Sequence, residues 1–170
     1  MGILEFLGAV GRVIVGVLGL DVGNADWIAQ HPQRLGIAVA VAAIAGISTL
    51  LGDAVVIFFN RLRGWRFALT LALNGIGMVL LYLVQAAVIY VIGPLISGFD
   101  PGFTAVVTAV LLATAPLVFG VFVLVPYAGP AIAGFLHVWG MVALWVIVDV
   151  VFRIDHWTAL WITLISWLCM

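Results

Sequence analysis

Residues 60–66 read Asn60-Arg61-Leu62-Arg63-Gly64-Trp65-Arg66 and separate two long apolar runs. This stretch carries three of the six basic side chains in a chain of 170 residues. Short arginine-rich loops between membrane-crossing helices tend to remain on the cytoplasmic side. The stretch therefore predicts the turn of a membrane hairpin whose cytoplasmic side is set by Arg61, Arg63 and Arg66.

The composition is that of a membrane protein. Hydrophobic residues make up 66% of the chain, charged residues make up 8%, and the mean hydropathy is +1.37. Soluble domains are roughly half apolar and about a quarter charged. A net charge of −1 without any lysine leaves no basic stripe for a phosphate backbone, so we expect no nucleic-acid partner. The single Cys169 provides neither a disulfide framework nor a thiolate metal cluster, and no metal site is expected.

Apolar runs predict an all-α fold, a polytopic transmembrane helix bundle of about five spans. The bundle domain covers residues 35–170, with spans at about 35–59, 67–92, 103–125, 130–152 and 157–170. At ~1.5 Å per residue the first four can cross a hydrocarbon core of ~30 Å, whereas the last reaches only about 20 Å. The Gly93-Pro94 pair predicts the end of the second span, and Pro116 predicts a kink in the third.

Residues 1–34 are expected to form an N-terminal amphipathic helix followed by a polar loop. A helical projection of residues 2–20 places one polar stripe opposite one apolar stripe. The polar stripe contains Glu5, Ala9, Arg12 and Gly16, and the apolar stripe contains Ile3, Leu7, Val10, Ile14, Val17 and Leu18. This pattern is typical of a helix that lies in the membrane interface. The alternative is a short first span in which the Arg12 side chain extends to the surface.

Small residues at four-residue spacing predict close helix packing. Ala38, Ala42 and Gly46 form such a stripe in the first span. Gly129, Ala133 and Gly140 share a face with His137 in the fourth. Small side chains allow two membrane helices to approach closely, so these faces are candidate helix contacts.

Two polar residues lie at matching depth in the predicted hairpin. Asp53 lies eight residues before Arg61 and Asn74 lies eight after Arg66, so both lie ~12 Å from the same membrane surface. The simplest interpretation is a hydrogen bond between Asp53 and Asn74, or an ion pair from Asp53 to an arginine of the loop. A proton or cation relay would need further polar groups, and only Gln85 is available in these spans.

His137 is the other candidate site, because ionisable groups inside a membrane are costly. A neutral imidazole is a good axial ligand for the metal of a tetrapyrrole such as chlorophyll. The alternative is a histidine satisfied by a hydrogen bond between helices. Near the end of the fourth span, Asp149 and Arg153 have the spacing of a local ion pair.

The chain contains no nucleophile elbow and no His-Glu-x-x-His zinc helix, so we expect a non-enzymatic protein. Three segments resemble the bacterial, and especially the cyanobacterial, branch of the Yip1-like membrane proteins. They are Asn60–Phe67, Ala115–Gly120 and Val125–Pro130, within a region of roughly residues 50–145. The resemblance implies a five-span helical bundle without known catalysis, in a family whose eukaryotic members act in membrane trafficking through partner contacts. It implies no functional residue for this chain.

The sequence thus predicts a multi-pass integral membrane protein that scaffolds or organises other membrane proteins, with the lipid bilayer and integral membrane proteins as partners. One alternative is an accessory or assembly subunit of a large bioenergetic complex, with lipid or a pigment held near His137. If the source is cyanobacterial, the location is the thylakoid or plasma membrane. A second alternative is a transporter or channel subunit.

Overall fold

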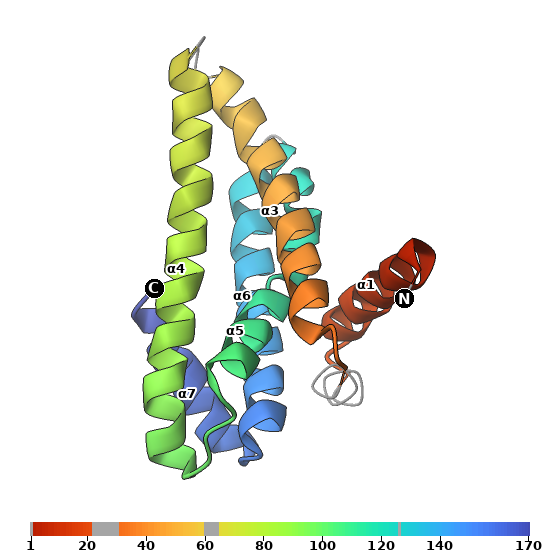
Figure 1. The fold of residues 1–170 in the computed structure, drawn as a ribbon. Helices are drawn as coiled ribbons and strands as arrows, with labels where there is room; N and C mark the ends of the chain where they lie inside the picture. Colours follow the sequence, from red (N-terminus) through yellow and green to blue (C-terminus); the bar gives the residue numbers. More distant parts are fainter. Residues whose placement is uncertain (1, 22–30, 60–64, 126) are drawn as a thin grey trace.

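The computed structural model describes residues 2–21, 31–59, 65–125 and 127–170, with side chains throughout except at residues 53–59 and 67. The described residues form only helices and turns (Figure 1). The helices are α1 (Ile3–Leu18), α3 (Arg34–Phe59), α4 (Trp65–Ser97), α5 (Phe103–Leu112), the 3₁₀ helix η1 (Ala115–Leu124), α6 (Gly129–Phe152) and α7 (His156–Leu168). The all-α class predicted from the sequence is confirmed.

Four helical segments of the described chain are long and apolar enough to cross a membrane. They are Arg34–Gly52, Ala68–Ser97, Phe103–Leu124 and Gly129–Phe152, and they correspond to the first four predicted spans. Helix α7 has 13 residues and extends about 20 Å, which is less than a ~30 Å hydrocarbon core. It is the short fifth segment that the sequence predicts. The protein is therefore a polytopic helical membrane protein.

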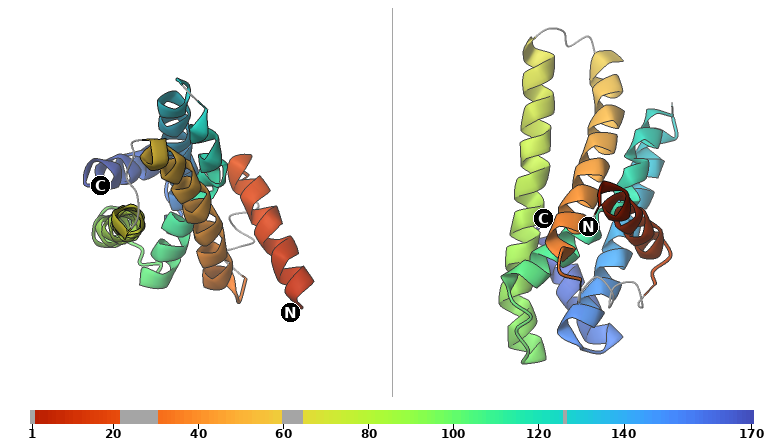
Figure 2. Two further views of the ribbon diagram at one scale, coloured as in Figure 1. Left: turned by 90° about the horizontal axis from the view of Figure 1, so that it is seen from above. Right: turned by 45° about the vertical axis from the view of Figure 1, so that its right-hand side comes forward.

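The helices are packed unevenly along the length of the bundle. The core lies toward the end where α3 begins and where α4 and α6 finish, and its largest fully buried side chains include Phe152, Ile37, Ile89, Leu144 and Ile162. Helix α3 packs most closely on η1. Seen from above, α4 stands apart from α3, and α1 lies on the other side of the bundle (Figure 2). Residues of α3, α4 and α5 line an apolar groove on this side of the bundle.

Helix α4 does not end at Gly93-Pro94 as predicted, but continues to Ser97. Gly93 is buried, and a Cβ at this position would overlap the ring of Phe152 from α6. This close packing supports the additional turn beyond Pro94. The helix stops at Gly98, whose φ of +69° is favourable only for a residue without a Cβ, and whose N–H donates to the Pro94 carbonyl over 2.9 Å.

The third span is not the single kinked α-helix that Pro116 predicts. Helix α5 ends at Leu112, and η1 continues as a 3₁₀ helix from Ala115. Pro116 lies at the start of η1, where its missing N–H leaves no helical hydrogen bond unmade. The hydroxyl of Ser48 in α3 then donates to the Val118 carbonyl over 2.6 Å and accepts from the Val121 N–H over 3.0 Å. A neighbouring helix therefore satisfies backbone groups that an α-helix would satisfy internally.

Helix α1 has 16 residues, and its buried face combines Val10 and Val17 of the predicted apolar stripe with Ala9 of the polar stripe. Ala9, expected on the polar stripe, is buried with Val10, Val13 and Val17. Ile3, expected on the apolar stripe, is 81% exposed. The i, i+4 and i+8 relation of residues 9, 13 and 17 sets the contact face, because these positions lie on one side of a helix. Ile3, Leu4, Leu7 and Val15 remain exposed.

Candidate functional site

His137 lies on α6, eight residues after its first residue and so ~12 Å along the helix. Its side chain is exposed on the surface of the bundle. The His137 Nδ1 atom lies 2.8 Å from the Ala133 carbonyl oxygen. Because a carbonyl can only accept, Nδ1 must carry the proton, and Nε2 of the neutral ring then presents its lone pair to an incoming group.

Two hollows adjoin His137, Leu117 and Leu136. The larger, of about 210 Å³, lies among α3, α4, η1 and α6, and Thr49 and Asn74 provide polar groups on its wall. The smaller, of about 30 Å³, lies among α4, α5, α6 and α7. Its lining includes Tyr82, Gln85 and Trp167. His137 therefore borders two spaces that contain polar side chains within the span.

Gln85 is the most enclosed of these polar groups. The residue is 3% exposed. Buried amides are normally hydrogen-bonded. The neighbouring hollow of about 30 Å³ exceeds the ~10–15 Å³ that one water needs, so a water or a small polar group fits beside the Gln85 amide.

Two of the three small residues near His137 pack against the backbone of another segment of the same chain. A Cβ at Gly129 would overlap the Val123 carbonyl, and a Cβ at Gly140 would lie 3.1 Å from the Ala113 carbonyl. These glycines thus face the α5–η1 segment. Ala133 borders the larger hollow, leaving His137 at the edge of the packed face.

The small residues of the stripe on α3 lie in two different surroundings. Ala38 is fully buried in the core, whereas Ala42 and Gly46 line an apolar groove of about 510 Å³ between α3, α4 and α5. A Cβ at Gly46 would meet no atom within 4 Å. No described helix of this chain contacts Gly46 closely, so the predicted helix approach at Gly46 stays a prediction.

The predicted hairpin pair falls mostly outside the described residues. The Asp53 side chain, Arg61 and Arg63 are not described, so the contact between Asp53 and Asn74 stays a prediction. Asn74 lies on α4 beside the 210 Å³ hollow. Arg66 is exposed in the first turn of α4, as expected for a residue near the membrane surface.

The turn between α6 and α7 corrects the predicted ion pair. Asp149 pairs with His156, while the Arg153 guanidinium lies 5.5 Å from the centre of the Phe99 ring. Arg153 adopts a left-handed conformation with φ of 54° and ends α6. The Arg153 N–H still donates to the Asp149 carbonyl, but its guanidinium lies beside the Phe99 ring.

Asp155 caps α7 by accepting from the Trp157 and Thr158 N–H groups and from the Thr158 hydroxyl. The hydrogen bond from the Thr158 hydroxyl, followed by that from the Thr158 N–H, lowers the pKa of the Asp155 carboxyl. These bonds favour the ionised form and position the start of α7.

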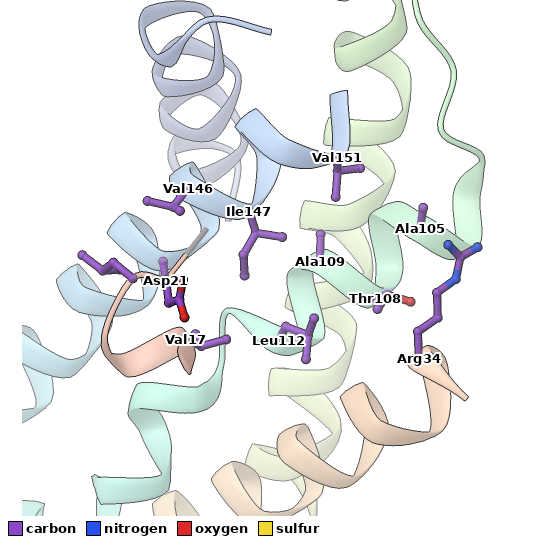
Figure 3. A pocket seen from close by; sticks show the side chains of 12 residues that line it. Val17, Asp21, Arg34, Ala105, Thr108, Ala109, Leu112, Val146, Ile147 and Val151 are labelled. Atoms are coloured by element: carbon purple, nitrogen blue, oxygen red, sulfur yellow. The ribbon is translucent and has the colours of Figure 1, made fainter. Parts of the chain in front are cut away.

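A separate small hollow of about 40 Å³ lies where α1 ends against α5 and α6. Figure 3 shows Asp21 and Arg34 at opposite sides of this hollow, with apolar side chains such as Leu112 and Ile147 between them. It has room for a water but for no larger ligand. We therefore do not assign a binding role to it.

Among the described residues, no three His, Cys, Asp or Glu side chains are grouped in a way that could hold a metal. No family model, no curated protein and no solved structure matches this chain. The class of the protein is thus defined by its fold, a polytopic membrane bundle. The site is defined by its geometry, an exposed histidine within a span.

Proposed function

We propose that the protein is a non-enzymatic integral membrane protein that organises other membrane proteins by lateral contact through the face of α6 around His137. The observation that carries the proposal is the exposure of His137 ~12 Å along a membrane-crossing helix. Ionisable side chains at such depth nearly always face protein or a water-filled cavity, because exposure to lipid is costly. A partner helix would cover the ring.

The neighbouring residues suit a helix contact. Gly134, His137 and Val138 lie at i, i+3 and i+4, and Gly134 and Val138 are also exposed. A Cβ at Gly134 would meet no atom within 4 Å, so a second helix can approach the α6 backbone there. A donor on that helix would hydrogen-bond to Nε2 of His137. Such a role agrees with the partner contacts that the Yip1-like resemblance implies.

The test is site-specific photocross-linking in native membranes. A photoreactive phenylalanine at Val138 should give a product with one integral membrane protein, and one at Leu95 of α4, which is 80% exposed, should not. His137→Ala should reduce the Val138 product several-fold, whereas the matched variant His156→Ala should leave it unchanged. The proposal would be refuted by equal amounts of cross-linked product at Val138 and Leu95, or by a Val138 product that His137→Ala does not reduce.

One observation favours a second candidate function, a subunit that holds a tetrapyrrole pigment for a bioenergetic complex. Metal-bound imidazoles commonly donate their other ring N–H to a carbonyl, as His137 Nδ1 does to Ala133. Such a subunit would reside in a photosynthetic membrane, such as a thylakoid. Absorption bands in protein purified from native membranes, weakened by His137→Ala, would support this function; a colourless eluate would reject it.

A further inference from the structure

An apolar groove of about 510 Å³ runs between α3, α4 and α5, and His137 is not among the residues that line it. It occupies the middle of two membrane spans, along residues 39–50 of α3 and residues 75–86 of α4. Tyr82 and Thr114 provide the only hydroxyl groups on its described wall, and the Thr114 hydroxyl already donates to the Leu111 carbonyl over 2.6 Å. The groove is therefore nearly devoid of hydrogen-bonding groups that water could use.

Small residues leave space at several points on the wall of the groove. On α3 they are Ala42, Ala43, Ala45 and Gly46, beside the larger Val39, Ile47 and Leu50, and on α4 they are Gly75 and Ala86, beside Met78, Val79, Tyr82 and Leu83. A Cβ at Gly46 would meet nothing within 4 Å, so the space in front of it is open. Figures 1 and 2 show α4 standing apart from α3 over this stretch. The Leu50 side chain of α3 reaches Gly75 of α4, and the groove opens beside this contact.

We propose that this groove binds one hydrocarbon chain of a bilayer lipid. The four spans place the groove within the hydrocarbon core, where acyl chains are the solvent. An engineered apolar cavity of ~150 Å³ binds benzene, which has six carbons. By that ratio the groove holds on the order of 20 carbons, comparable to a single long acyl chain.

The lining of the groove favours a hydrocarbon chain as its occupant. The groove extends for ~17 Å along α3, and its wall is almost entirely apolar. Water is disfavoured because the wall gives it almost no partners. Cross-linking through introduced cysteines distinguishes a second copy of this chain from lipid as the occupant.

The experiment uses the full chain in phosphatidylcholine vesicles that contain a phospholipid with a diazirine at the middle of one acyl chain. After irradiation, mass spectrometry should find Met78 and Leu50, in the groove, labelled several-fold more than Leu80 and Val84, which are exposed on α4 outside it. Gly46→Leu should reduce groove labelling several-fold and leave Leu80 unchanged. The matched control Gly36→Leu lies on the same helix, also in open space, but outside the groove, and should have no effect.

Ala43→Leu narrows the same groove from an exposed position and keeps the test decisive if Gly46→Leu impairs folding. Uniform labelling of groove and outer residues would overturn the inference, as would groove labelling that neither variant reduces. Dimers cross-linked through cysteines introduced at groove positions, in place of lipid adducts, would assign the groove to a second copy of the chain. The result is independent of the His137 face, because the variants leave α6 unchanged.

Discussion

Ser48→Ala should loosen the contact between α3 and η1. The Ser48 side chain is 9% exposed, and its oxygen both donates to the Val118 carbonyl and accepts from the Val121 N–H. Alanine removes both hydrogen bonds without adding volume. The two backbone groups would then lose their side-chain partner in the span Phe103–Leu124, where water is scarce.

The expected loss follows from those two bonds. Hydrogen bonds between membrane helices contribute about 0.6 kcal/mol on average and up to about 1.7 kcal/mol. Leaving a buried backbone group unsatisfied costs about 1–3 kcal/mol. The free energy of unfolding of Ser48→Ala should therefore fall by about 1–3 kcal/mol, because both partners of the hydroxyl are affected.

The assay is reversible unfolding in mixed micelles with increasing dodecyl sulfate, followed by tryptophan fluorescence. The matched control is Thr70→Ala, whose hydroxyl donates over 2.9 Å to the Arg66 carbonyl within its own exposed helix. This change should stay within about 0.5 kcal/mol of wild type. If Ser48→Ala costs no more than Thr70→Ala, then η1 does not depend on α3 and the reasoning fails.

Three further predictions concern packing, capping and the α6–α7 turn. Gly52→Ala should lower the free energy of unfolding by about 1–3 kcal/mol, because the new Cβ would lie 2.6 Å from a backbone carbonyl oxygen of η1. The control Gly46→Ala should not lower it, and unfolding titrations compare the two variants. Asp155→Ala should lower the melting temperature at neutral pH. The pKa of Asp155 in the folded state lies below the ordinary 3.8. The difference in melting temperature between wild type and Asp155→Ala should therefore disappear as the pH falls below the folded-state pKa, and thermal unfolding at pH 7 and at pH 2 tests this. Trp145→Phe removes the 2.7 Å bond from Nε1 to the His156 carbonyl and should cost about 0.5–1.5 kcal/mol, and an unchanged unfolding midpoint would contradict that.

The spans could be predicted because each depends on local composition. A long apolar run must satisfy its backbone within one helix once it is in lipid, whatever its neighbours are. The starts of α3 at Arg34 and of α6 at Gly129 accordingly lie within one residue of the predicted positions. The predicted end of α4 was wrong: Gly93 lies within the helix, packed on Phe152 from far along the chain, and the helix ends only at the left-handed Gly98.

The candidate site was only partly predictable. His137 stands out in the sequence as an ionisable residue in an apolar run, and its local bond to Ala133 follows from helix geometry. The role of Ser48 was missed, since a serine in an apolar helix usually bonds to its own preceding turn. The sequence signal for this contact is Pro116. A proline disrupts the third span and leaves backbone groups that another helix must satisfy.

The sequence by itself determined that the chain enters a membrane, that it does so as helices, and about where each span lies. These properties follow from hydrophobic length and from backbone hydrogen bonding, both of which are local. Only the tertiary structure decided which face of α1 is buried, how η1 departs from an α-helix, and that Gly46 opens onto a groove while Gly140 meets a neighbouring backbone. The physical reason is that identical small residues have opposite surroundings when helix packing brings a neighbour to one and leaves the other uncovered.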